Sequence, residues 1–364
     1  MKPLEPGHFF LPGPTEVHPD VVAAQAQPMI GHRGAAIVEL IARLEEGLKP
    51  VFVTERPVII STSSATGLME AAIRNGVATG RVLALVNGAF SLRFSEIARM
   101  CGKEVEIWEV PWGSVHSPEG LAERLGEAHY DAVILTQSET STGALQDLGA
   151  LAAVVAQHED TMLMVDSVTG VGGVETRTDD WSLDFVVTGS QKALALPPGL
   201  AFGVASEALL ERSKQIPDRG WYFDLARLSQ SMTKNQTPAT PAVSLLYALD
   251  VQLARIAGEG IEERWKRHLA MQQRTLEWVE TVGELGAPIG PFAVEGHRSP
   301  TVTCISFVEE GRAPAVVAKM SELGWVIGGG YGKLKSSTIR IGHMGDHTVE
   351  ELESLLEVLG EVVL

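Results

Sequence analysis

Two stretches decide the fold of this chain: Thr161-Met-Leu-Met-Val-Asp166-Ser167 and Asp184-Phe-Val-Val-Thr-Gly-Ser-Gln-Lys192. In each, a short apolar run ends at polar or turn residues, which is the pattern of a buried strand in a parallel sheet. Such sheets place their chemistry at the carboxyl ends of the strands. We therefore expect Asp166 and Lys192 to follow two neighbouring strands, so that a carboxylate and an amine meet at one edge of the sheet.

This pair of residue types suggests a particular chemistry. A lysine that forms a Schiff base and an aspartate that pairs with a pyridinium nitrogen are the protein's part of pyridoxal phosphate catalysis. Aspartates and lysines that follow strands are also common in solvated loops, so the two residues alone leave that interpretation open. The cofactor hypothesis depends on further residues.

Further apolar runs alternate with stretches of helical periodicity, which indicates an α/β fold. The alternation is lost near Ser206, and a long helical pattern, broken at residues 258–260, leads into a smaller α+β region. Thr348 and Glu351 have the spacing of a capping box for the last helix. The strands expected before Ser206 cover residues 58–61, 82–86, 105–110, 132–135, 162–165 and 185–187.

The composition excludes several classes of protein. The chain has 364 residues and a formal net charge of -17, which disfavours binding to nucleic acid or to anionic membranes. It shows neither a secretory signal at its start nor an apolar stretch of membrane-spanning length. Its two cysteines, Cys101 and Cys304, lack the spacing of a zinc site or a disulfide framework. We expect a cytoplasmic protein without a metal.

A turn rich in small polar residues is a candidate anion site. The segment Ser61-Thr-Ser-Ser-Ala-Thr-Gly67 follows an expected strand and opens a helix, so its backbone N–H groups and the hydroxyls of Ser64 and Thr66 can face a phosphate. A simple capping turn is the alternative. The segment Gly328-Gly-Gly-Tyr-Gly-Lys333 lacks the Ser or Thr of a nucleotide-binding loop, and we interpret it as a flexible loop before a strand.

Three more side chains suit a site for an anionic, flat ligand. Gln191, beside Lys192, offers an amide to a phosphate, and Phe90 either stacks on a heterocycle or caps the core. Arg340 alternates with two isoleucines in Thr338-Ile-Arg-Ile-Gly342. Its planar guanidinium suits bidentate capture of a carboxylate, although strand arginines at the surface are also common.

Four ordered motifs together resemble the class V aminotransferases of pyridoxal phosphate fold type I, and most of all the alanine–glyoxylate and serine–pyruvate aminotransferase group. The resemblance extends from Leu11-Pro-Gly-Pro-Thr15 to the last helix. The motifs are Glu139-Thr-Ser-Thr-Gly143, Val165-Asp-Ser-Val-Thr-Gly170, Thr188-Gly-Ser-Gln-Lys-Ala-Leu194 and Thr338-Ile-Arg-Ile-Gly342.

The resemblance implies a domain organisation. A large domain (residues 21–257) would hold a mainly parallel seven-stranded sheet flanked by helices and would bind the cofactor. A smaller C-terminal α+β domain (residues 258–364) and an N-terminal arm (residues 1–20) would complete the chain.

The resemblance also implies roles for individual residues. Lys192 would be the Schiff-base lysine and would move the proton, Asp166 would keep the pyridine nitrogen protonated, and Arg340 would bind the substrate's α-carboxylate. The family is dimeric with a shared active site, so two threonines would serve the neighbouring subunit. The other implied cofactor contacts are Ser64, Ala65, Thr66 and Gln191 at the phosphate, Phe90 and Val168 at the ring, Thr140 at the phenolic oxygen, and Thr237 and Thr240 from the neighbouring subunit.

The substrate is less closely defined than the reaction. The resemblance favours transfer from alanine or serine to glyoxylate or pyruvate by a ping-pong mechanism. Residues 32–33 and 340–345 also resemble relatives that use phosphoserine or aspartate with 2-oxoglutarate. The sequence does not decide whether Arg33 or His343 contacts the substrate. If Arg33 points into the pocket, a second anionic group is favoured. A desulfurase would need a mobile cysteine late in the chain, and a non-catalytic protein would be expected to lose Lys192 or Asp166.

Overall fold

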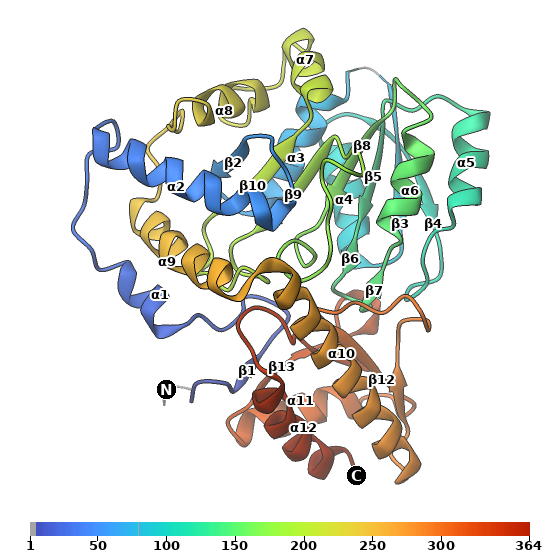
Figure 1. Cartoon of the computed structure of the whole chain (residues 1–364). Coiled ribbons are helices and arrows are strands. Elements are labelled where there is room, and N and C mark those ends of the chain that lie inside the picture. Colours follow the sequence, from blue (N-terminus) through green and yellow to red (C-terminus); the bar gives the residue numbers. More distant parts are fainter. Residues whose placement is uncertain (1–4, 79) are drawn as a thin grey trace.

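A seven-stranded sheet forms the centre of the larger part of the molecule (Figure 1). The computed structural model describes residues 5–78 and 80–364, so the first four residues of the expected N-terminal arm lie outside the described residues. Within these residues the strand order is β2-β10-β9-β8-β5-β3-β4, and β10 alone runs antiparallel to its neighbours. The strands are β2 (Val58–Ser61), β3 (Arg81–Val86), β4 (Glu104–Glu109), β5 (Ala132–Thr136), β8 (Met162–Asp166), β9 (Phe185–Gly189) and β10 (Ala201–Ala205).

Helices cover both faces of this large sheet because its central strands are apolar on both sides. In β5, Val133 and Leu135 belong to one core cluster, and Ala132 and Ile134 belong to the other. Buried parallel strands have this continuous apolar pattern. The first face is covered by α1 (Pro19–Ala24), α2 (Ala35–Phe52), α5 (Pro118–Glu127), α6 (Leu148–Val155) and α9 (Val243–Glu259), and the second by α3 (Ala65–Gly76), α4 (Ala89–Met100), α7 (Glu207–Gln215) and α8 (Leu225–Met232).

A second, smaller sheet lies below the first, with the strand order β1-β13-β14-β12-β11. Its first strand comes from the N-terminal arm, and Phe9 pairs in parallel with Val326. Helices α10 (Ile261–Glu284), α11 (Arg312–Glu322) and α12 (Val349–Val363) share one core with this sheet. The strands are β1 (Phe9–Phe10), β11 (Ile289–Pro291), β12 (Thr303–Phe307), β13 (Val326–Gly329) and β14 (Thr338–Ile341), and the remaining short elements are β6 (Ser138–Glu139), β7 (Ala144–Leu145) and the 3-10 turn η1 (Gly332–Leu334).

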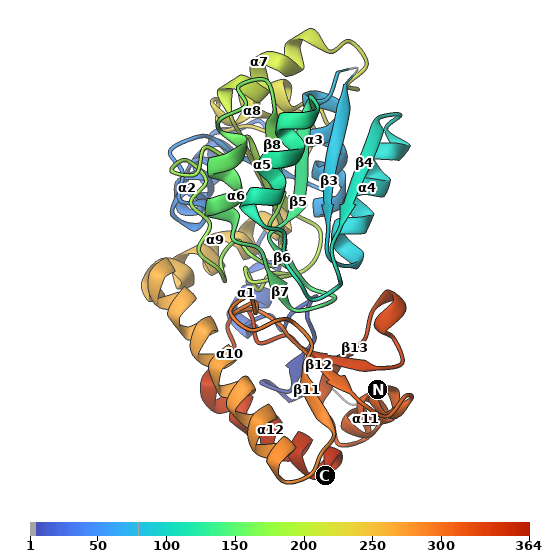
Figure 2. The same ribbon diagram turned by 90° about the vertical axis from the view of Figure 1, so that its right-hand side faces the viewer.

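The two parts are joined at a helix break. Helix α9 ends at Glu259, Gly260 adopts the left-handed region with φ 85°, and α10 then continues along the small sheet (Figure 2). Glycine tolerates this conformation without strain, which accounts for the break expected at residues 258–260. The domain boundaries themselves stay a prediction.

Most expected elements are confirmed. All six strands expected before Ser206 are present to within a residue or two, and the capping box formed by Thr348 with Glu351 has the predicted hydrogen bonds. Strand β10 was not expected, because the prolines and glycine at residues 197–199 obscured the apolar run that follows them.

The interpretation of the Gly-rich segment was partly wrong. Gly328 and Gly329 are the last residues of β13 and pair with β14, and the 3-10 turn η1 follows. A Cβ atom on Gly330 would lie 2.0 Å from the carbonyl oxygen of Leu334, so glycine is required there for a tight turn. The segment is a shaped turn between two strands.

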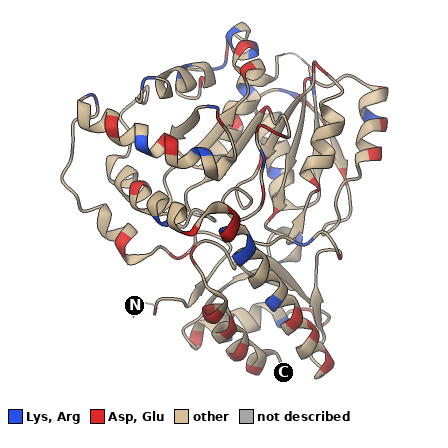
Figure 3. Cartoon of the chain, in the orientation of Figure 1, with Lys and Arg blue, Asp and Glu red and all other residues tan. Residues whose placement is uncertain are grey.

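The excess negative charge lies largely on surface helices (Figure 3). In α12, for example, every charged side chain is a glutamate. Within residues 5–78 and 80–364, no helix combines the length and the apolar character needed to cross a bilayer.

Candidate active site

Asp166 and Lys192 lie at the carboxyl ends of neighbouring strands. Strand β8 ends at Asp166, and Asp166 pairs with Val187 of the parallel strand β9. Lys192 follows β9 by three residues. Both side chains line a cavity of about 130 Å³. The other residues around this cavity are Ser64, Ala65, Thr66, Met69, Phe90, Arg93, Thr136, Ser138, Thr140, Val168, Thr169 and Gln191.

Asp166 is buried, and its carboxylate accepts two hydrogen bonds. The backbone N–H of Val168 donates to Oδ1 over 2.9 Å, and the Thr136 hydroxyl donates to Oδ2 over 3.2 Å. Burial nevertheless dominates and raises the pKa of Asp166 to about 7, with the nearby charge of Glu139 acting in the same direction. A cation placed against this carboxylate would lower the pKa again.

The N-terminal arm holds the amine of Lys192. Nζ donates to the carbonyl oxygen of Pro12 over 2.5 Å, and the Thr15 hydroxyl donates to the carbonyl oxygen of Lys192 over 3.1 Å. Gly13 has φ 92°, a conformation that favours glycine, and a Cβ atom there would lie 2.4 Å from Nζ. Burial, followed by the charge of Arg340, lowers the pKa of Lys192 to about 8. The sequence did not predict this role of the N-terminal arm. The Pro-Gly-Pro turn at residues 12–14 is the one feature that could have indicated it.

The N-terminus of α3 opens into the same cavity. Ser64 is the N-cap residue, but within the described residues its side chain makes no capping hydrogen bond. The first N–H groups of the helix are therefore available to a ligand, and the helix dipole favours an anion at that position. Ser64 and Thr66 are exposed, Ala65 is buried, and Gln191, which also lines the cavity, is half-buried.

Glu139 positions the first turn of α4, and sequence reasoning missed this role. Its buried carboxylate accepts from the backbone N–H groups of Phe90 over 3.1 Å and Ser91 over 2.8 Å. The Ser141 hydroxyl donates to the same carboxylate over 2.6 Å. A Cβ atom on Gly88 would lie 2.3 Å from Glu139, so glycine allows this approach. The carboxylate fixes Phe90, which stacks on Tyr331 with a centroid distance of 5.1 Å.

Arg340 approaches from the small sheet. In β14 it pairs with Cys304 of β12 and Gly328 of β13. Its Nε donates to the carbonyl oxygen of Gly329 over 2.8 Å, and Nη1 donates to the carbonyl oxygen of Thr140 over 3.4 Å. Arg340 thus reaches a residue of the cavity wall from the other sheet, and burial lowers its pKa.

Two expected contacts lie elsewhere in this chain. Thr237 and Thr240 line a separate hollow with Thr62 and Trp221, so the structure does not bring them to Lys192. Arg33 lies against the same segment, where Nη1 donates to the carbonyl oxygen of Thr237 over 2.8 Å. In this chain the two threonines therefore lie away from the cavity, and their expected contact with the cofactor of a neighbouring subunit stays a prediction.

His343 does not reach the cavity surface either. It is fully buried, and its Nε2 lies 2.8 Å from the Thr303 hydroxyl. Burial lowers the pKa of His343 to about 4, so its imidazole is neutral near pH 7. Direct contact with a substrate in the cavity is not supported by this position.

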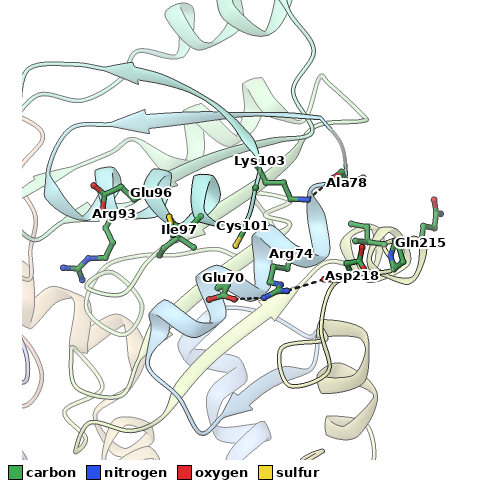
Figure 4. A pocket seen from close by; sticks show the side chains of 14 residues that line it. Glu70, Arg74, Ala78, Arg93, Glu96, Ile97, Cys101, Lys103, Gln215 and Asp218 are labelled. Atoms are coloured by element: carbon green, nitrogen blue, oxygen red, sulfur yellow. Dashed lines mark hydrogen bonds and ion pairs between the residues drawn. The ribbon is translucent and has the colours of Figure 1, made fainter.

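A larger hollow lies elsewhere on the molecule (Figure 4). It measures about 940 Å³ and lies between α3, α4 and the segment after α7. Two of its charged groups have partners, since Arg74 pairs with Glu70 over 2.9 Å and Lys103 donates to the Ala78 carbonyl oxygen over 2.9 Å. Arg93 lines this hollow as well as the cavity beside Lys192. The volume of a hollow therefore does not identify the active site of this protein. The buried carboxylate of Asp166 and amine of Lys192 do.

The sequence matches the family model of aminotransferase class V over residues 18–328. An uncharacterized aminotransferase of Methanocaldococcus jannaschii is 38% identical over 93% of this chain and 87% of its own length. Among solved structures, an alanine–glyoxylate aminotransferase from Nostoc sp. has a TM-score of 0.92 at 30% identity, over 100% of this chain and 96% of that one. An aspartate aminotransferase of subgroup IV from Thermus thermophilus has a TM-score of 0.86 at 34% identity, over 98% of both chains.

The two sheets, with the lysine and aspartate at neighbouring strand ends, have the architecture of fold type I of the pyridoxal phosphate enzymes. The chain belongs to the class V aminotransferase family and is an enzyme of that family. The resemblance inferred from the four sequence motifs is thereby confirmed, including its relation to the glyoxylate aminotransferases.

Proposed function

We propose that this enzyme binds pyridoxal 5'-phosphate at the cavity between Asp166 and Lys192 and transfers an amino group from an L-amino acid to a 2-oxo acid. The observation that carries the proposal is the buried carboxylate and amine on adjacent parallel strands, beside a helix N-terminus without a side-chain cap. Family membership supports it, because class V aminotransferases typically use this cofactor.

The cavity residues fit this cofactor group by group. The N–H groups of Ala65 and Thr66, the Ser64 hydroxyl and the Gln191 amide suit a phosphate. Phe90 and Val168 suit the two faces of a flat ring, and Thr140 suits its phenolic oxygen. Bound pyridoxal phosphate supplies an electron sink for the negative charge left when the substrate's Cα loses its proton.

The chain's own residues supply binding and proton transfer. Asp166 keeps a positive charge on the pyridine nitrogen through a charge-assisted hydrogen bond. Lys192 would hold the cofactor through its amine and would also move the proton taken from the substrate's Cα. A pKa near 8 suits a group that must both accept and donate a proton near neutral pH.

Arg340 binds the substrate's α-carboxylate and fixes which bond at Cα breaks. For Arg340→Lys we expect KM for the amino donor to rise by about 10-fold or more, because a point charge replaces a two-pronged donor. Steady-state kinetics with Arg99→Lys, an exposed position on α4, provide the control. Unchanged KM in Arg340→Lys would remove this residue from the substrate site.

A small donor, alanine or serine, and a small acceptor, glyoxylate or pyruvate, form our first substrate proposal. Arg33 supports it, because this guanidinium binds backbone carbonyl oxygens outside the cavity. The alternative is aspartate or phosphoserine with 2-oxoglutarate. Arg93, which lines the cavity, favours aspartate within that alternative.

We further propose a homodimer in which Thr237 and Thr240 reach the phosphate of the neighbouring subunit, and a cytoplasmic location. The separate hollow that these threonines line in the single chain is compatible with this arrangement. A desulfurase is disfavoured because burial raises the pKa of Cys304 to about 12, and Cys101 ends α4 beside the larger hollow.

A panel of single amino acids tests the proposed function. Each donor is mixed with the cofactor-loaded enzyme without an acceptor, and loss of the visible absorption of the bound cofactor reports the first half-reaction. We expect alanine or serine to respond, and glyoxylate or pyruvate to restore the absorption. Absence of a response to every amino acid would refute transamination.

A further inference from the structure

A second guanidinium, from Arg93, lines the cavity beside Phe90. Its carbon CZ lies 4.8 Å from the centroid of the Phe90 ring, and Nη2 donates to the Tyr331 hydroxyl over 2.7 Å. Arg93 makes no ion pair with any described side chain, and its charge helps to lower the pKa of Lys192. Figure 4 shows its guanidinium turned away from Arg74 and Lys103. Arg93 thus lines both the cofactor cavity and the larger hollow of Figure 4, and among the described side chains it has no anionic partner.

Tyr331 lies between this arginine and Arg340. The guanidinium carbon of Arg340 is 5.7 Å from the Tyr331 ring centroid, and that of Arg93 is 6.0 Å from the same centroid. The two guanidinium carbon atoms therefore lie at most about 12 Å apart. Charge-assisted pairs have donor–acceptor distances of about 2.8 Å, so a molecule with two carboxylates a few carbons apart spans the gap.

The segment that carries Tyr331 is held in place on both sides. Gly330 makes the tight turn before it, and after it Lys333 lies 4.1 Å from the centroid of Trp112 and 3.9 Å from Glu109. On the α4 side, Glu139 fixes the turn that begins with Phe90 and continues to Arg93. The hydroxyl and the guanidinium are therefore preorganised, which lowers the entropic cost of binding.

We propose that Arg93 and Tyr331 form a subsite for the side-chain carboxylate of a four-carbon dicarboxylic amino acid, of which aspartate is the type, while Arg340 binds the α-carboxylate. This inference rests on the proposed transamination and extends the donor range of the same cavity beyond small amino acids. In a ping-pong reaction the small acceptor uses Arg340 alone.

The competing use of Arg93 is the cofactor phosphate. That group would sit at the N-terminus of α3, where Ser64, Ala65 and Thr66 line the same cavity but supply no positive side chain. If Arg93 served the phosphate, its loss would weaken cofactor binding for every donor alike. If Arg93 instead binds the side-chain carboxylate, its loss would weaken only the preference for aspartate.

The experiment compares aspartate with asparagine, which has the same shape without the charge, and with alanine. Wild type, Arg93→Gln, Tyr331→Phe and the control Arg99→Gln are assayed for the first half-reaction. In wild type and control, we expect kcat/KM for aspartate to exceed that for asparagine by about 10-fold or more. Arg93→Gln should abolish this preference and reduce kcat/KM for aspartate by a larger factor than that for alanine, and Tyr331→Phe should reduce the preference by about threefold.

Three results would overturn the subsite. These are equal rates of wild type with aspartate and asparagine, an equal loss of rate with all three donors in Arg93→Gln, and a raised dissociation constant of the cofactor in Arg93→Gln. If no amino acid reacts with wild type at all, the proposed transamination fails instead, which separates the two failures.

A binding measurement gives a readout independent of turnover. Titration calorimetry on the cofactor-loaded protein compares succinate with butyrate, a monocarboxylate of equal chain length. We expect succinate to bind about 10-fold more tightly to wild type and Arg99→Gln, and equally weakly to Arg93→Gln. Equal binding of the two acids to wild type would contradict the subsite.

Discussion

Lys192→Ala is expected to reduce transamination by about 1000-fold or more. General acid–base groups contribute roughly 100- to 10000-fold, and this lysine is proposed to attach the cofactor as well as to move the proton. The loss should appear in the half-reaction with alanine and be partly restored by a free primary amine such as methylamine. Lys266→Ala, at an exposed ion pair on α10, is the matched control.

The same substitution has a pH signature in the cofactor-free protein. Burial lowers the folded-state pKa of Lys192 to about 8, so between about pH 8 and the unfolded-state pKa near 10.4 the unfolded chain binds the extra proton. Wild-type stability should therefore rise with pH in this window, and Lys192→Ala should lack that rise. Full turnover of the variant together with an unchanged stability profile would refute the assignment.

Sequence reasoning succeeded where the signal was local. Asp166 and Lys192 each follow a short run that is apolar on both faces, and this pattern defines both the strand and its end. Helix caps such as Thr348 with Glu351 were equally readable, because the interacting residues are three positions apart. The placement of the reactive pair thus required no long-range information.

It failed where the partners are distant in the chain or contribute only backbone. The Pro12 carbonyl oxygen that holds Lys192 has no side-chain signature, and the two residues are 180 positions apart. Glu139 was recognised only as part of a motif, since its bonds go to backbone N–H groups of Phe90 and Ser91. Tyr331 was hidden in a Gly-rich run whose strand, β13, exists because β1 and β14 pair with it.

Asp166→Asn is expected to lower turnover by roughly 100- to 1000-fold, the usual cost of removing one preorganised electrostatic partner. Asparagine keeps an oxygen for the Val168 N–H and can donate to the Thr136 hydroxyl, so the local packing survives. Neutral asparagine cannot keep a positive charge on the pyridine nitrogen. The half-reaction with alanine measures the loss, and Asp180→Asn on the surface is the control.

Asp166→Asn lowers turnover, but in the cofactor-free protein we expect it to raise stability. Burial raises the folded-state pKa of Asp166 to about 7, so between about pH 4 and pH 7 the folded protein keeps a proton that the unfolded chain releases. Wild-type stability therefore falls as pH rises through this window, and at pH 8 the cofactor-free Asp166→Asn protein should have the higher Tm. With the cofactor bound, the pyridinium charge compensates the carboxylate, and wild type should have the higher Tm. Equal Tm differences with and without cofactor would show that Asp166 does not face the pyridine nitrogen.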